Sequence, residues 1–181
     1  KGDYGRVLSF DNFLEAVDDD WLVREVKNYW KRVLKRLDVT SRSLVALIEP
    51  GSCFTGTLAE IAFACDRTFM HSGGRKGDDR PAATMTLSSL NFGPYPMSNN
   101  LTRLETRFLG EPQSVQSAKE TVGVAQSASV CEDLGLVTIA FDDVDWDDEI
   151  RIFLEERAGF SADGLTGLEA NLRFAGPETM E

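Results

Sequence analysis

The stretch from Gly56 to Glu60 combines two features that could stabilise and move charge during a reaction. Gly56 lets a ligand approach the backbone closely because it has no side chain, and the Thr57 amide follows it where we expect a helix to begin. The first amides of a helix have no intrahelical partner and lie at the positive end of its dipole. They bind anions, or an oxygen that gains negative charge during a reaction. Glu60, one turn further on, would lie near enough to transfer a proton.

Two of the candidate residues also have structural interpretations. Thr57-Leu-Ala-Glu60 matches the capping box, in which the glutamate accepts a hydrogen bond from an amide at the start of its helix, and the sequence alone favours that role. Cys53 could be a reactive thiol beside the site, although a buried cysteine more often only fills space. The one histidine, His71, has no pattern of serine and acid around it that would favour catalysis.

Three successive elements would position these residues. The apolar run from Ser43 to Ile48 has a length that suits a buried strand. Pro50, Gly51 and Gly56 then interrupt regular structure. From Thr57 onward the apolar residues recur at the spacing of one helical face, at Leu58, Ile61, Ala62, Cys65 and Phe69.

The rest of the chain gives weaker signals. We expect the tail of a strand at 6–10, and a strong helix at 21–37 that is acidic at its start and basic at its end. A polar, glycine-rich loop at 72–81 would form a surface loop or a lid over a substrate. A strand is expected at 83–90 and a turn at 91–97. Helices are expected at 101–109, within 114–134, at 146–157 and from Ser161 to before Gly176.

Composition limits the class of protein. The 181 residues are 42% hydrophobic and 27% charged, which is typical of a globular chain with a core. The net charge of −11 argues against nucleic acid or an anionic membrane surface as partner. The three cysteines have neither metal-binding spacing nor an even number for disulfides, so we expect reduced thiols in a cytoplasmic protein. No apolar run reaches transmembrane length.

Several strings in the sequence resemble the crotonase superfamily, the family of enoyl-CoA hydratases and isomerases. The stretch from Gly51 to Asp66 resembles its signature of strand, glycine-rich turn and helix ending in Ala-Cys-Asp. A ring-opening branch of the superfamily, whose long chain has two crotonase-like halves, is the closer resemblance, and this chain is similar to part of the C-terminal half. The strings that carry it lie at 37–43, 48–54, 91–97 and 165–181.

The resemblance implies a fold and a division of the chain. It implies an α/β crotonase-like fold, a ββα superhelix with C-terminal helices, incomplete at both ends. Residues 1–158 would form the partial core, and 159–181 a C-terminal helical segment packing on the core or a neighbouring subunit. It also implies a homo-oligomer, a dimer or larger.

The resemblance further implies an activity, namely hydrolytic ring opening of 2,3-epoxybenzoyl-CoA to a semialdehyde-CoA and formate in aerobic benzoate degradation. The thioester oxygen would be held by the Thr57 amide and by a second amide near Ser9 or Phe10. Glu60 and Ser89 occupy the family's catalytic positions, and the other implied substrate contacts are Gly56, Cys53 and Asn91. The acyl-CoA is the substrate, and no metal or other cofactor, nucleic acid or membrane is implied.

Two alternatives stay open. In a tandem protein this half could be a non-catalytic scaffold and dimerisation surface. It could also be a generic enoyl-CoA hydratase or isomerase, but such enzymes have a second glutamate where this chain has Ser89. Serine is no general base at neutral pH without an activating partner.

Overall fold

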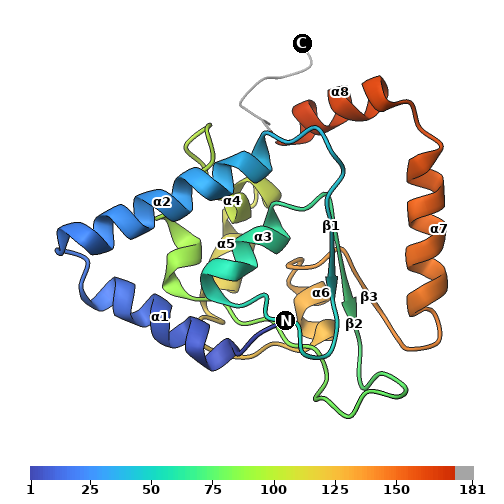
Figure 1. The fold of residues 1–181 in the computed structure, drawn as a ribbon, viewed down its shortest axis with the longest axis horizontal. Coiled ribbons are helices and arrows are strands. Elements are labelled where there is room, and N and C mark those ends of the chain that lie inside the picture. Colours follow the sequence, from blue (N-terminus) through green and yellow to red (C-terminus); the bar gives the residue numbers. More distant parts are fainter. Residues whose placement is uncertain (174–181) are drawn as a thin grey trace.

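A three-stranded parallel sheet lies at the centre of the computed structural model, which describes residues 1–173 (Figure 1). The strands are β1 (Val45–Ile48), β2 (Arg67–His71) and β3 (Ile139–Phe141), paired in the order β1-β2-β3. Val45 lies opposite Arg67, and Phe69 opposite Ile139. Parallel neighbours need a crossover connection, and here helical segments of the chain supply it.

The crossover from β1 to β2 contains the candidate site. After β1 the chain turns at Gly51, then forms a short 3₁₀ helix, η1 (Gly56–Leu58), that continues into α3 (Ala59–Phe63). The predicted order of strand, loop and helix is confirmed, but Phe69 lies in β2 and not on the helical face. The helix ends early because the Thr68 hydroxyl donates to the carbonyl of Ala62 and the chain then pairs with β1.

Two helices precede the sheet, α1 (Tyr4–Ala16) and α2 (Trp21–Asp38). The prediction of a helix at 21–37 is confirmed, and the Asp20 carboxylate caps it by accepting the amides of Leu22 and Val23. The predicted strand tail at 6–10 is wrong, because these residues lie inside α1. Asp3 caps that helix, and Asp11 and Leu14 are buried one turn apart on its inner face.

Residues 83–88 are mostly buried but form only isolated bridges at Met85 and Thr86, so the prediction of a strand at 83–90 is wrong. Its backbone partners come from different segments in turn: Thr86 bridges Thr55, whereas Met85 bridges Gln126. No continuous ladder can form with such scattered partners. The segment then turns into a second 3₁₀ helix, η2 (Ser89–Phe92).

Helices surround the sheet on its other sides. The predicted helices near 101–109 and within 114–134 correspond to α4 (Arg103–Arg107), α5 (Pro112–Lys119) and α6 (Ala128–Asp133). The predicted helix at 146–157 is α7 (Trp146–Ala158), which packs on the face of the sheet that carries Phe69, and α8 (Ala162–Arg173) follows it at the top of the view (Figure 1). The end of the 159–181 segment, from 174 onward, lies outside the described residues.

The main hydrophobic core lies between the sheet, α3 and α4–α6, and includes Ile48, Ala62, Met70, Leu104 and Leu136. A second cluster joins α1 and α2 through Leu14 and Leu34, and a third packs Phe69 against Trp146. The 72–81 loop is tied to the body through Arg75, which pairs with Glu49 and Asp147. Its role as a lid stays a prediction. Within 1–173, no helix has the length and apolar character required to span a membrane.

Candidate functional site

The Thr57 amide already has an anionic partner within the chain. It donates to Oδ2 of Asp11 at 2.7 Å, and the Thr57 hydroxyl donates to Oδ1 of the same carboxylate at 2.7 Å. The Ser88 hydroxyl also donates to Oδ2, at 2.7 Å. Asp11 is 1% exposed, so this carboxylate is buried in a cradle of three donors. The Thr57 amide at the start of η1 therefore binds a carboxylate of the chain itself, from α1, and its role as an oxyanion donor to a substrate stays a prediction.

Gly56 is required for this contact on two grounds. Its φ of +50° is in the left-handed region that favours glycine, and a Cβ there would lie 2.1 Å from Oδ2 of Asp11. Gly56 therefore allows the Asp11 carboxylate to lie against the backbone, whereas approach of a ligand at this point stays a prediction.

Glu60 lies deep in the protein and is 1% exposed. Its Oε1 accepts a hydrogen bond from the side-chain amide of Asn91 at 2.7 Å, and its Oε2 accepts one from Nη1 of Arg103 at 2.9 Å. The capping box is not formed, because the Glu60 carboxylate is engaged by these two side chains and the Thr57 hydroxyl is engaged by Asp11. Burial raises the pKa of Glu60, and the charge of Arg103 opposes that rise.

Arg103 joins two buried carboxylates. It binds Asp38 through two parallel hydrogen bonds, Nε to Oδ1 at 3.0 Å and Nη2 to Oδ2 at 2.6 Å, and it binds Glu60 with Nη1. The same Nη1 donates to the carbonyl of Tyr95 at 3.1 Å. We refer to Asp38, Arg103 and Glu60 as the buried ion triad, which links α2, α4 and α3.

Tyr95 connects the triad with the Asp11 cradle. Its hydroxyl lies 3.2 Å from the Thr57 hydroxyl, and its carbonyl accepts from Arg103. Burial raises the pKa of Tyr95 to about 12, so the phenol is neutral at physiological pH. Asn91 makes a second link, since its amide nitrogen donates to the carbonyl of Gly56 at 2.9 Å as well as to Glu60. Asn91, Thr57 and Glu60 are therefore brought together as one network.

The other predicted site residues lie around this network. The Ser89 hydroxyl donates to Oε2 of Glu15 at 2.6 Å, so Ser89 has a carboxylate partner from α1. Cys53 is buried, and burial raises its pKa, which leaves the thiol protonated and weakly nucleophilic. Ser9 and Phe10 lie in the interior of α1, where backbone amides bond within the helix. The second oxyanion amide expected near Ser9 or Phe10 is thus not a free donor in this structure.

Reasoning from the sequence missed Asp11, Arg103 and Asp38 as members of this network. Asp11 had a detectable signal, because it shares a helix face with Leu14 and would be buried with it. Arg103 had no such signal beyond its place on a basic helix, because its partners Glu60 and Asp38 are 43 and 65 residues away in sequence. Among residues 1–173, no group of three or more His, Cys, Asp and Glu side chains could hold a metal ion.

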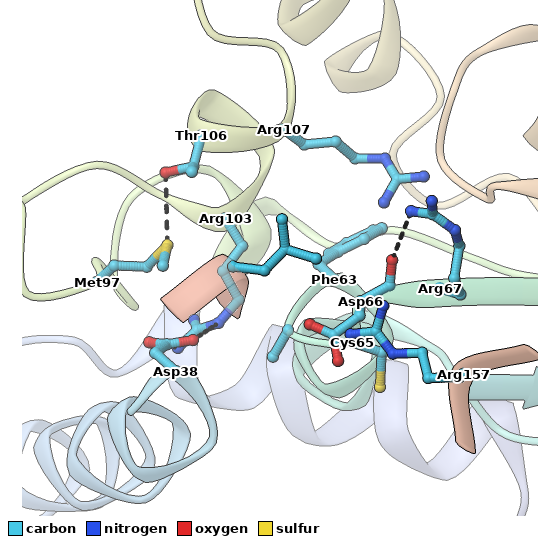
Figure 2. A pocket seen from close by; sticks show the side chains of 12 residues that line it. Asp38, Phe63, Cys65, Asp66, Arg67, Met97, Arg103, Thr106, Arg107 and Arg157 are labelled. Carbon is cyan, nitrogen blue, oxygen red and sulfur yellow. Dashed lines mark hydrogen bonds and ion pairs between the residues drawn. The ribbon is translucent and has the colours of Figure 1, made fainter. Parts of the chain in front are cut away.

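A cavity of about 380 Å³ opens near the C-terminal end of α3, at the far end of that helix from Thr57 (Figure 2). Neither Thr57 nor Glu60 lines it, and Arg103 and Asp38 are the members of the buried ion triad that reach it. Its charged lining residues are Asp38, Asp66, Arg67, Arg103, Arg107 and Arg157.

The fold is a partial crotonase-like α/β fold, and comparison with solved structures shows this directly. The chain superposes on an enoyl-CoA hydratase from Geobacillus kaustophilus with a TM-score of 0.62 at 19% identity, covering 90% of this chain and 56% of that one. AtuE from Pseudomonas aeruginosa matches with a TM-score of 0.62 at 18% identity, covering 87% and 56%. At such low identity the likeness concerns the fold, and the implied fold class is confirmed. No protein-family model matches the chain.

The sequence itself is similar to a particular enzyme, benzoyl-CoA-dihydrodiol lyase from Aromatoleum evansii. The two are 48% identical over 180 residues, which covers 99% of this chain and 32% of that enzyme. The chain thus spans about a third of the length of its relative. The similarity to this enzyme that the sequence strings indicate is confirmed over nearly the whole chain.

Proposed function

We propose that the full-length protein is a CoA-thioester lyase that opens the ring of 2,3-epoxybenzoyl-CoA by hydrolysis, giving a semialdehyde-CoA and formate. The 48% identity with a benzoyl-CoA-dihydrodiol lyase, sustained over 99% of the chain, carries the proposal. The crotonase-like fold supports it, because the matching solved structures include enzymes named for CoA substrates.

In this reaction the chain would supply an oxyanion donor and a proton-transfer group. The Thr57 amide would polarise the thioester carbonyl, and one such donor is worth about 3 kcal/mol of barrier. The Glu60 carboxylate, with its raised pKa, would activate water, with Asn91 holding it in place. Asp11 occupies the Thr57 amide, so α1 has to withdraw this carboxylate before a substrate oxygen can take its place.

A second candidate role for this chain is structural support within a longer enzyme whose catalytic groups lie elsewhere. The specific observation in its favour is that the chain's own side chains satisfy both proposed catalytic groups. Asp11 accepts the hydrogen bond of the Thr57 amide. Asn91 and Arg103 each donate a hydrogen bond to one oxygen of Glu60. The cavity near α3 does not reach either group.

Substitution of Glu60 in the full-length protein separates the two roles. Glu60→Gln keeps the size of the side chain and removes its charge, and Glu25→Gln on the exposed face of α2 is the matched control. A catalytic Glu60 predicts a loss of formate release of about a hundredfold, with the control unaffected. Turnover that is unchanged in Glu60→Gln would refute the catalytic role and leave the supporting one.

A further inference from the structure

The cavity at the C-terminal end of α3 contains two arginines that the proposed reaction does not use. Arg107 comes from the end of α4 and Arg67 from the start of β2, and Figure 2 shows their guanidinium groups turned toward each other. Nε of Arg107 donates to the carbonyl of Gly135 at 2.5 Å, and Nη1 of Arg67 donates to the carbonyl of Asp66 at 3.1 Å. Each therefore keeps further N–H donors for another partner.

These two cations differ from the other arginines that line the cavity. Arg103 is balanced by Asp38 and Glu60, and Arg157 by Glu169 at 2.5 Å. Neither Arg67 nor Arg107 forms an ion pair with a carboxylate anywhere in the part of the chain that the structure describes. The nearby Asp66 carboxylate accepts the backbone amide of Leu44 at 2.6 Å. The pair thus leaves an excess of positive charge at one side of the cavity.

The electrostatics of Arg107 are unfavourable as long as no anion is bound. Burial lowers the pKa of its guanidinium, and the charge of Arg67 lowers it further. Arg107 is partly buried, and a partly desolvated charge beside a like charge is unfavourable unless a counter-charge compensates it. An anion between the two groups would remove both penalties.

We propose that this cavity is a binding site for a phosphate-class dianion held between Arg67 and Arg107. Two planar guanidinium groups match the oxygens of a phosphate, and a dianion neutralises both charges where a monoanion would leave one. The volume of about 380 Å³ exceeds that of the phosphate alone, so the group can belong to a larger molecule. Free phosphate and the 3′-phosphate of a CoA ester share this chemistry. The site does not depend on the proposed reaction.

Calorimetric titration of the full-length protein with inorganic phosphate, at constant ionic strength, tests the proposal. Arg67→Gln should weaken phosphate binding about tenfold or more, because charge-assisted hydrogen bonds are lost. Arg67→Lys, which keeps the charge without the planar fork, should give an intermediate affinity. Arg24→Gln, an equal change of charge on the exposed face of α2, should bind as wild type does. Equal affinity of wild type and Arg67→Gln, or no binding by wild type, would overturn the proposal.

Melting temperature gives a second readout that does not require tight binding. In phosphate-free buffer Arg67→Gln should melt no lower than wild type, since it relieves repulsion and Arg67 is exposed. Added phosphate should then stabilise wild type and Arg24→Gln, but not Arg67→Gln. Stabilisation of all three to the same extent would refute a site at Arg67.

Competition distinguishes the two sources of the phosphate group. If CoA displaces bound phosphate and dephospho-CoA, which lacks the 3′-phosphate, does not, the site receives the CoA end of a ligand. If neither displaces it, the site receives free phosphate.

Discussion

One arginine holds two buried acids in the centre of this protein. The side chains of Asp38 and Glu60 are 2% and 1% exposed, and both pair with Arg103, which is itself 1% exposed. Removing the cation would leave two carboxylates in a medium that solvates them poorly. The triad is therefore a point where a single substitution should have a large effect.

We predict that Arg103→Met destabilises the protein by about 3–5 kcal/mol, the usual cost of breaking a buried ion pair from one side. The free energy of unfolding from urea titrations measures this. Arg24→Met on the exposed surface of α2 is the control and should lie within about 0.5 kcal/mol of wild type. A cost for Arg103→Met as small as that of the control would mean that Asp38 and Glu60 are not held as the structure shows.

The pH dependence of stability tests the environment of Glu60. Its folded pKa is raised above the ordinary value of 4.5 by burial, so the folded state favours the protonated form. Glu60 therefore contributes stability that is fully present below pH 4.5 and is lost as pH rises through the folded pKa. The stability of wild type relative to Glu60→Gln should fall as pH increases over this window, measured by unfolding at several pH values. A relative stability that rises with pH would show that attraction to Arg103 outweighs desolvation.

Among the elements, α1 contacts the start of the η1–α3 segment through the buried carboxylate of Asp11. Asp11 receives hydrogen bonds from Thr57 and Ser88, which belong to two different turns, and it lies against Gly56. The α1 helix thus covers the start of the η1–α3 segment, and any ligand that approaches the Thr57 amide has to compete with it.

We predict that the effects of Gly56→Ala and Asp11→Ala on the free energy of unfolding are not additive. Gly56→Ala should cost about 1–2 kcal/mol for its left-handed backbone and a further ~1–3 kcal/mol for overlap with Asp11. Adding Asp11→Ala should recover the second part, so the double variant is more stable than the sum of the single changes by ~1 kcal/mol or more. Gly73→Ala is the control, because its φ is +80° with nothing within 4 Å, and its cost should not depend on Asp11. Strict additivity for Gly56 and Asp11 in urea unfolding would contradict the contact.

Local signals explain which elements the sequence predicts. The strand at 45–48, the loop with Gly51 and Gly56, and the helix α2 with its Asp20 cap follow from patterns within a few residues. The segment at 83–90 misleads because a run of buried residues resembles a strand, while its actual partners lie in three different places. The 6–10 stretch misleads because its helical state depends on Asp3 and on burial of Asp11 against a turn 46 residues later.

Across the whole molecule, the residues of the candidate site also fall into two groups: those that local sequence patterns indicate, and those that only the fold brings together. Gly56, Thr57, Glu60 and Asn91 can be recognised from the sequence because they belong to short strings with a family resemblance. Burial of Asp11 can be inferred from its helix face, but the partners of Asp11 and Arg103 cannot, because the contacts join α1 to η1 and α4 to α3 across more than 40 residues. These long-range partners determine whether the oxyanion donor and the carboxylate are available for chemistry.

Formate release by the full-length protein is the measurement that separates the proposed ring opening from ordinary hydration. We would incubate the purified full-length protein with 2,3-epoxybenzoyl-CoA and measure formate and the semialdehyde-CoA in parallel, with crotonyl-CoA as a substrate for ordinary hydratase activity. The proposed reaction gives formate and semialdehyde-CoA in equal amounts, with little hydration of crotonyl-CoA. Rapid hydration of crotonyl-CoA with no formate from the epoxide would contradict it.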